Sequence, residues 1–206
     1  MRFKCVTAFG TNYCLEVRGS TIQAHKSFHD EAERRKWQNP EGILAEIGLT
    51  PGQTFIDVGC GDGFFAIPAA KLVGKRGKVY GLDINEEAIQ RLKEKADKEG
   101  LENLILKVGA AEDLVLCRGC ADYVFFGIDL HDFRDPPKVL INAKKMLKPG
   151  ARLIDLDWKK EPMELGPPIG IRFSQEEAVT RIEEAGFRVH SVKQEGRYHY
   201  LIAARV

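Results

Sequence analysis

Residues 55–64 read FIDVGCGDGF, an apolar run followed by three closely spaced glycines. The apolar run, from Thr54 to Val58, predicts a strand, and the residues from Phe64 to Val73 predict a helix. Glycine lets a backbone bend sharply and approach a ligand closely. Because doubly wound sheets bind ligands at the carboxyl ends of their strands, this turn is the first candidate for a binding site.

Strands and helices alternate along the chain after this turn. The further strands are expected over residues 78–82, 104–108, 122–126, 152–156, 187–192 and 198–204, and the helices over residues 26–47 (in two pieces), 86–98, 136–147 and 176–185. Alternation predicts a parallel sheet with helices on both faces, and the last two strands, with no helix between them, predict one antiparallel strand. We therefore expect an α/β fold with a doubly wound, Rossmann-like, seven-stranded sheet, mostly parallel with one antiparallel strand.

The start of the chain has a different pattern. Residues 2–9 and 13–18 alternate apolar and polar side chains on either side of Gly10-Thr11-Asn12, which predicts a short hairpin. We therefore divide the chain into a hairpin appendage, residues 1–24, and a main domain with its leading helix, residues 25–206.

Composition narrows the class of protein. The chain has 206 residues and a net charge of +1, with 31 basic and 30 acidic residues, which argues against nucleic acid as a partner. No apolar run approaches the roughly 20 residues that span a bilayer, and the N-terminus lacks the pattern of a signal peptide. We expect a cytoplasmic protein without a membrane span, and homo-oligomerisation is left open.

Two acidic residues narrow the kind of ligand. Asp57 lies two residues before the first glycine of the turn, where its charge would repel the pyrophosphate of a dinucleotide. S-adenosylmethionine (SAM) has no phosphate and carries a sulfonium and an α-ammonium, which a carboxylate attracts. Asp83 follows the next strand, where an acid accepts hydrogen bonds from ribose hydroxyls. Together these acids favour an adenosyl ligand; the alternative is that the glycines serve only the turn and the acids are solvated loop ends.

The sequence resembles the class I SAM-dependent methyltransferases, and among them the group with ubiquinone and menaquinone biosynthesis enzymes and arsenite methyltransferases. The resemblance runs from about residue 28 to the C-terminus and is carried by FIDVGCGDGFF, VYGLDI, GAAEDL, ADYVFFGIDLHDF, MLKPGARLIDLDW and EEAGF. It implies SAM as the cofactor and methyl transfer to a small-molecule acceptor as the reaction.

The resemblance also implies roles for single residues around the cofactor. The glycine turn, with Gly59, Cys60, Gly61, Gly63 and Phe64, would hold the methionine end.

Asp57 would contact the ammonium, and Asp83 the ribose, with Ile84 against the adenine. Phe126 and Gly127 would line the methionine end.

The adenine would also meet the loop around residue 111. Ala111 would offer its backbone N–H to the ring, and Glu112 or Asp113 would lie near its amino group. Many relatives carry Asp, Asn or Ser where this chain has Ala110, so the side chain that recognises the amino group stays open.

Candidates for the acceptor side follow the fourth and fifth expected strands of the sheet. His131 is the candidate general base, because its ordinary pKa of about 6.5 suits proton transfer near neutrality; the alternative is a histidine that only hydrogen-bonds its loop. Asp129 could contact the acceptor or the cofactor, although we favour a solvated loop residue. Trp158 could stack on the acceptor or pack in the core, and Arg172 could bind an acidic group or be a surface cation.

The cysteines could form a disulfide or a zinc site. Cys117 and Cys120 form a C-x-x-C pair that could close a disulfide or, with Cys5 and Cys14, bind zinc. The second pair is spaced more widely than usual zinc ligands, so no metal is expected. Cys60 is expected to be a small packing residue as well as part of the turn.

We therefore predict a SAM-dependent methyltransferase of class I. Two other functions stay open at this point: an NAD-dependent oxidoreductase, against which Asp57 argues, and a methyltransferase-like domain that binds SAM without turnover and acts as a regulatory or partner-binding protein.

Overall fold

The computed structural model of the chain describes residues 3–8, 11–16 and 31–206. Its contacts divide the chain into two units, Met1–Trp37 and Gln38–Val206. The larger unit therefore begins at Gln38, whereas the sequence analysis placed the start of the main domain at residue 25. The short helix α2 (Glu31–Arg34) falls in the first unit.

The first unit contains the expected hairpin. Strands β1 (Phe3–Ala8) and β2 (Thr11–Glu16) pair antiparallel, and Cys5 lies opposite Cys14 in the register. Thr11, which we expected in the turn, belongs to β2 instead. The expected helical residues 26–30 lie outside the described part of the chain.

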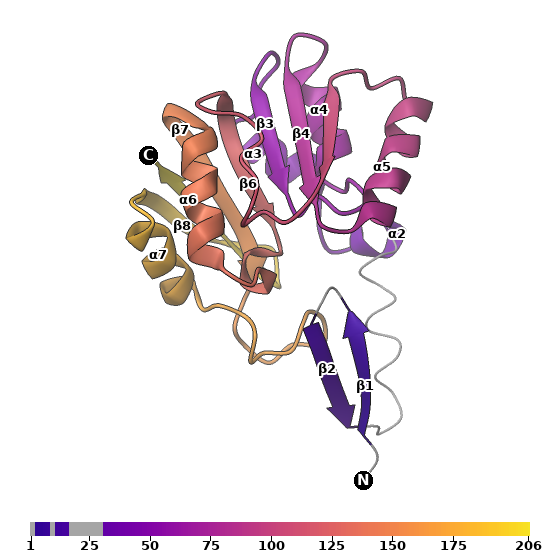
Figure 1. Cartoon of the computed structure of the whole chain (residues 1–206). Coiled ribbons are helices and arrows are strands. Elements are labelled where there is room, and N and C mark those ends of the chain that lie inside the picture. The colour runs from indigo at the N-terminus through magenta and orange to yellow at the C-terminus, as the bar shows by residue number, and fades with distance from the viewer. Residues whose placement is uncertain (1–2, 9–10, 17–30) are drawn as a thin grey trace. The chain divides into compact units, whose positions relative to one another are not determined.

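The second unit is built on a seven-stranded sheet with the order β5-β4-β3-β6-β7-β9-β8 (Figure 1). Its strands are β3 (Thr54–Val58), β4 (Lys78–Asp83), β5 (Leu104–Val108), β6 (Ala121–Gly127), β7 (Leu147–Trp158), β8 (Arg188–Glu195) and β9 (His199–Arg205). All neighbours pair parallel except β9, which lies antiparallel between β7 and β8. The predicted fold class is confirmed.

Helices cover both faces of this sheet, and each face has its own apolar core. On one face lie α3 (Pro40–Glu46), α4 (Ala66–Val73) and α5 (Glu86–Lys98); on the other lie α6 (Pro136–Met146) and α7 (Gln175–Glu184) (Figure 1). Alternate residues of β6 show the division, since Phe125 belongs to the first core and Phe126 to the second. Among the described residues, no helix is long and apolar enough to cross a membrane.

The helix starts follow the expected capping chemistry. Asn85 accepts a hydrogen bond from the Ala88 N–H at the start of α5, as predicted. Ser174 and Glu177 form a reciprocal capping box at the start of α7. These local signals explain why the boundaries of α5 were predicted correctly.

Strand β7 differs from the prediction. It begins at Leu147, directly after α6, and runs through Pro149, whereas the sequence predicted a strand only over residues 152–156. The register shifts between the Leu147 and Arg152 pairings with β6, so the proline lies at an irregularity of the ladder. Proline has no N–H to donate to a regular ladder, so within a strand it is tolerated at an irregularity of this kind.

Candidate active site

The glycine turn lies between β3 and α4, at the carboxyl edge of the sheet. Gly59, Gly61 and Gly63 have φ angles of 77°, 49° and 88°, in the left-handed region that favours glycine. The N–H groups of Gly59 and Cys60 both donate to the Leu82 carbonyl, at 2.7 and 3.1 Å, which ties the turn to β4.

The three glycines have different surroundings. A Cβ atom on Gly63 would collide with the Leu92 side chain, so this glycine allows α5 to pack against the turn. A Cβ on Gly59 would overlap the Asp129 carboxylate. Around the corresponding position of Gly61, no atom of the described residues lies within 4 Å, apart from those of its chain neighbours. The backbone at Gly61 is therefore accessible to a ligand.

Asp83 is held beside this open glycine. Its Oδ2 accepts from the Gly61 N–H and its Oδ1 accepts from the Asn85 N–H, both at 2.8 Å. Each carboxylate oxygen has a second lone pair, so Asp83 can still accept from ribose hydroxyls. The next residue, Ile84, is 62% exposed, as an apolar surface that receives an adenine ring would be.

The loop around Ala111 is attached to α6. Glu112 Oε1 accepts from the N–H groups of Arg134 and Asp135, just before α6 begins, and Asn142 Nδ2 donates to the carbonyls of Ala111 and Glu112. The Glu112 oxygen expected at the adenine is thus engaged with the start of a helix. Buried Asn142 was missed by the sequence analysis; a single amide on the apolar face of the predicted helix was the available signal.

The end of β6 brings a strained residue to the site. Gly127 has no room for a side chain, because a Cβ atom would lie 2.9 Å from Phe125 and 3.0 Å from Phe65. The following residue, Ile128, has φ 71°, a conformation that a β-branched residue rarely adopts. Strained backbone of this kind gathers at binding and active sites.

Asp129, which follows, is not a solvated loop residue, and that part of the sequence analysis is wrong. Both carboxylate oxygens are buried and take no hydrogen bond from any described residue. Burial raises its pKa well above the usual value, and the charges of Asp57, Asp157, Asp155 and Asp83 raise it further. The carboxyl end of the sheet therefore concentrates acidic groups around Asp129, and the two oxygens of one of them, Asp155, are likewise buried without a hydrogen bond from a described residue.

His131 and Asp157 form a buried pair. His131 Nδ1 lies 2.7 Å from Asp157 Oδ1, and the His131 backbone N–H donates to Asp157 Oδ2 at 3.3 Å. With the proton on Nδ1 facing the carboxylate, Nε2 carries the lone pair. It is buried, accepts no hydrogen bond from the described residues and lies 3.4 Å from Asp132 Oδ1. Burial lowers the pKa of His131, but Asp157 and Asp132 outweigh it and raise the pKa overall.

A family model described as a methyltransferase domain matches residues 49–201. The chain belongs to this methyltransferase family. A SAM-dependent methyltransferase from Aquifex aeolicus is 34% identical, with a TM-score of 0.82, over 91% of this chain and 98% of that one. The predicted class I SAM-dependent methyltransferase is therefore confirmed as family and fold, and SAM is the cofactor.

Curated relatives of the methyltransferase match a shorter stretch. The demethylmenaquinone methyltransferase of Geobacillus kaustophilus is 33% identical over 122 residues, 59% of this chain and 51% of the relative. That of Bacillus cytotoxicus is 32% identical over 150 residues, 72% of this chain and 59% of the relative. The chain thus spans only a little more than half the length of these relatives.

The described residues of the methyltransferase fit SAM. The backbone at Gly61 is open, Asp83 is fixed beside it, and Ile84 is an exposed apolar surface. The buried carboxylate of Asp129, without a partner among the described residues, lies against Gly59, where a cationic group would compensate its charge. The single contacts predicted for Asp57, Ala111 and Phe126 stay predictions.

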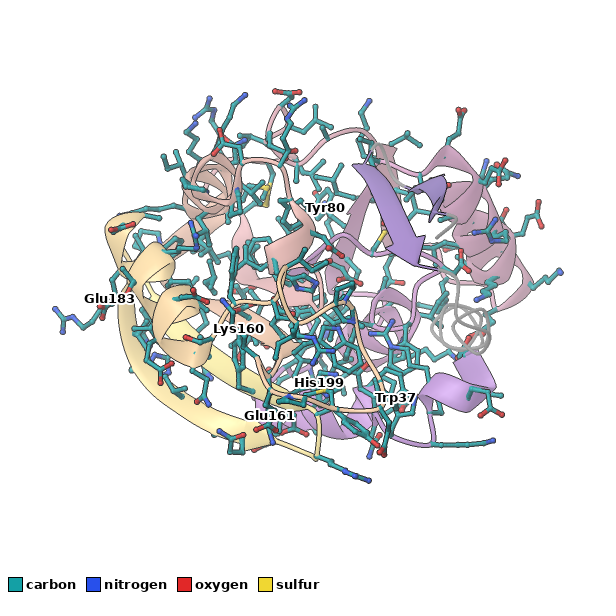
Figure 2. The ribbon with its side chains drawn as sticks, turned by 90° about the horizontal axis from the view of Figure 1, so that it is seen from below. Trp37, Tyr80, Lys160, Glu161, Glu183 and His199 are labelled. Carbon is teal, nitrogen blue, oxygen red and sulfur yellow. A yellow bond between two sulfur atoms is a disulfide. The ribbon has the colours of Figure 1, made fainter. Side chains whose placement is uncertain are left out.

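Trp158 and Arg172 are buried in the methyltransferase. The Trp158 ring centroid lies 4.3 Å from that of His199, on the neighbouring strand, and the Arg172 guanidinium lies 5.9 Å from it. Figure 2 shows the molecule from below and labels His199. Arg172 donates to four carbonyls of the segment after β7, those of Lys159, Glu161, Leu165 and Pro167.

Arg172 therefore holds this segment together and is not a surface cation. Its donors are directed at backbone, which leaves the predicted contact with an acidic acceptor without support from the geometry.

The cysteines of the methyltransferase do not form a metal cluster among the described residues. Cys117 and Cys120 are joined by a disulfide. The expectation that Cys60 is a packing residue is confirmed, since it is buried and its Sγ would lie 2.9 Å from a Cβ on Gly81. Burial raises the pKa of its thiol well above the usual value, so it is not a reactive thiolate.

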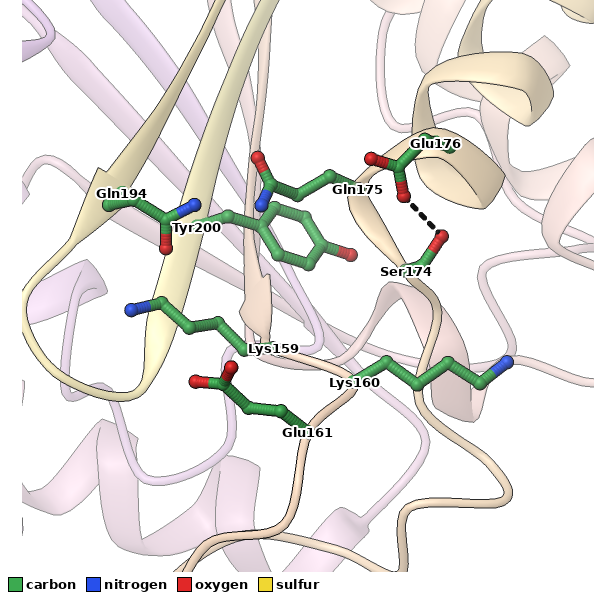
Figure 3. Close-up of a pocket in the computed structure, with 8 residues that line it drawn as sticks. All are labelled: Lys159, Lys160, Glu161, Ser174, Gln175, Glu176, Gln194 and Tyr200. Carbon is green, nitrogen blue, oxygen red and sulfur yellow. Dashed lines mark hydrogen bonds between the residues drawn. The ribbon is translucent and has the colours of Figure 1, made fainter.

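A polar pocket of about 190 Å³ lies beside the start of α7 (Figure 3). Its cations are engaged: Lys160 pairs with Glu177, and Lys159 donates to the carbonyls of Gly196 and Arg197. The pocket is smaller than the roughly 300 Å³ at which ligand sites begin, and it does not contain the glycine turn. It is not the cofactor site.

Proposed function

We propose that the chain transfers the methyl group of SAM to a small-molecule acceptor that loses a proton in the reaction. The observation that carries the second part is the buried His131–Asp157 pair, whose Nε2 atom takes no hydrogen bond from the described residues. The cytoplasmic location and self-association of the chain stay predictions.

Different residues of the chain would bind the cofactor and remove the proton of the acceptor in such a reaction. SAM, when bound, supplies a methyl group on a sulfonium, which is electrophilic. The glycine turn and Asp83 would hold the cofactor, with Asp83 on the ribose and Ile84 against the adenine. Much of the rate of a methyl transfer can come from aligning the two reactants and excluding water.

His131 would remove the proton of the acceptor at Nε2. Asp157 would hold the Nδ1–H tautomer and stabilise the imidazolium that forms, because its carboxylate contacts Nδ1. A general base of this kind contributes roughly 10²- to 10⁴-fold to a rate.

The first acceptor to test is reduced demethylmenaquinone. The curated relatives are named demethylmenaquinone methyltransferases, and a hydroquinone has an acidic hydroxyl that a histidine can deprotonate. The proposal extends to other aromatic hydroxyl compounds, because the chain spans only part of those relatives.

The test starts with binding. Calorimetric titration with SAM, S-adenosylhomocysteine and NAD should show micromolar binding of the two adenosyl ligands and none of NAD, with Asp83→Ala weakening both. Transfer of labelled methyl from SAM is then measured with reduced demethylmenaquinone, catechol and arsenite. Binding without transfer to any acceptor class would favour a SAM-binding domain without turnover and contradict the proposal.

A further inference from the structure

Asp129 has a position that no hydrogen bond within the described residues explains. Its carboxylate lies directly against Gly59, so closely that a Cβ on this glycine would overlap Oδ2. Both oxygens are buried and neither accepts a hydrogen bond from a described residue. Buried polar groups are nearly always hydrogen-bonded, so the two oxygens point to a missing donor.

The backbone before Asp129 is held in an unfavourable conformation. Ile128 has φ 71°, and its N–H donates to the Leu156 carbonyl of β7 at 2.7 Å. The Ile128 side chain is partly buried against the first core, so packing and a backbone hydrogen bond fix this conformation. A strained residue that is fixed in this way, directly before an unpartnered carboxylate, indicates that the carboxylate is aimed at a ligand.

The groups that act electrostatically on Asp129 are all acidic. Asp57 comes from β3, Asp83 from β4, and Asp155 and Asp157 from β7. Burial and these four charges disfavour the ionised form, so without a ligand the carboxyl keeps its proton to a pH well above its ordinary range.

We infer that Asp129 binds the α-ammonium group of the cofactor and releases its own proton to solvent when it does so; this inference rests on the proposed function. An ammonium has three N–H donors and can satisfy both oxygens, whereas the sulfonium has none. The proton balance is simple. The protonated carboxyl of the free protein and the ammonium of free SAM become a carboxylate–ammonium pair, and one proton passes to the buffer.

The pH dependence of binding follows from this exchange. Where free Asp129 is protonated and bound Asp129 is ionised, the association constant rises about tenfold per pH unit. The rise ends at the pH where free Asp129 loses its proton, or near pH 8, where an α-amino group itself loses its charge. S-adenosylhomocysteine carries the same α-ammonium, so its binding should show the same slope.

Calorimetry of the full chain tests this inference. SAM is titrated at pH 5, 6 and 7 in two buffers that differ in ionisation enthalpy, and the difference in heat gives the number of protons released. At each pH where free Asp129 keeps its proton, wild type should release about one proton and gain about tenfold in affinity per pH unit. Asp129→Asn should release none and keep an affinity that does not change with pH. Asp97→Asn, an exposed carboxylate on α5, is the matched control and should behave as wild type.

Each outcome of this experiment supports or overturns the inference. Proton release that persists in Asp129→Asn would assign the proton to another acid and overturn the inference, as would no release by wild type at any of the three pH values. Release with SAM but not with S-adenosylhomocysteine would overturn the choice of the ammonium. A wild-type protein that binds neither ligand would contradict the proposed function itself. Absence of the slope in wild type would overturn the inference even where the variant fails to fold.

Discussion

Asp83 and Asp129 lie at the same edge of the sheet, one at the end of β4 and the other just after β6, and their carboxylates have opposite surroundings. Both oxygens of Asp83 accept from backbone N–H groups, while those of Asp129 accept from no described residue. The half of the site formed by β3 and β4 is thus preorganised by the backbone itself. The half formed by β6 and β7 contains the carboxyl of Asp129, whose partner must come from a ligand.

The largest expected effect concerns the second half. His131→Gln should lower the rate of methyl transfer by roughly 10²- to 10⁴-fold and leave SAM affinity unchanged, because the base contacts the acceptor and not the cofactor. Labelled methyl transfer and calorimetry measure the two quantities. His190→Gln, on β8, is the control, and an equal loss of SAM affinity would contradict the division of the site.

Asp157→Asn separates positioning from catalysis. It removes the charge that raises the pKa of His131, so that pKa should fall. Since the neutral imidazole is the active form, the acid limb of the pH–rate profile should move to lower pH while the maximal rate decreases. A profile of unchanged shape would show that Asp157 does not act through the histidine.

Two glycine substitutions sharpen the comparison within the preorganised half. Gly59→Ala should weaken SAM binding about 100-fold or more and lower stability by about 1–3 kcal/mol, because Ala collides with Asp129 at a left-handed φ. Gly61→Ala should lower stability less and act mainly on the ligand, since no described residue beyond its chain neighbours has an atom within 4 Å of the added Cβ. Thermal unfolding with and without SAM distinguishes them; equal losses of stability would contradict this reading of the turn.

Asp155→Asn tests, in the absence of a ligand, how the buried acids of the half formed by β6 and β7 affect stability. Burial and Asp157 raise the pKa of Asp155 well above its usual value. Such a carboxyl stabilises the fold fully below its unfolded pKa of about 3.9, and this contribution is lost as pH rises toward the folded pKa, by up to about 1.4 kcal/mol per pH unit. Relative to wild type, the variant should therefore be more stable at pH 8 than at pH 5. Denaturant unfolding at both values measures this difference, and no change between them would be the contrary result.

The smallest effect is expected away from both halves. Ser174→Ala removes the N-cap of α7 and should cost about 1 kcal/mol in unfolding free energy, with SAM affinity unchanged. A loss of affinity would mean that α7 and the pocket in Figure 3 are coupled to the cofactor site.

The sequence predicted the preorganised half well, because its signals are local. The glycines and the Asn85 cap each act within one turn of the chain, and Asp83 follows the next strand at a spacing that is visible in the sequence. The same holds for the mostly parallel sheet covered by helices, which follows from the alternation of elements.

The other half depends on contacts between residues far apart in the chain. His131 meets Asp157, and Asp129 meets Gly59, through the adjacency of strands, which no local pattern encodes. The positive φ of Ile128 could not be predicted either, because β-branched residues rarely adopt this conformation and the sequence around it contains no pattern that indicates it. For Arg172, a charge in a loop gave no sign that it would bind four carbonyls.

The position of β9 between β7 and β8 affects how the protein is made. During synthesis β8 leaves the ribosome before β9, the strand with which it pairs in the sheet. β8 and β9 are joined by a short connection and pair antiparallel, so they can form a hairpin that then adds to β7 through β9 as one piece. Until that step the β7 edge is exposed, and a nascent chain stalled there would offer an unpaired strand to its neighbours.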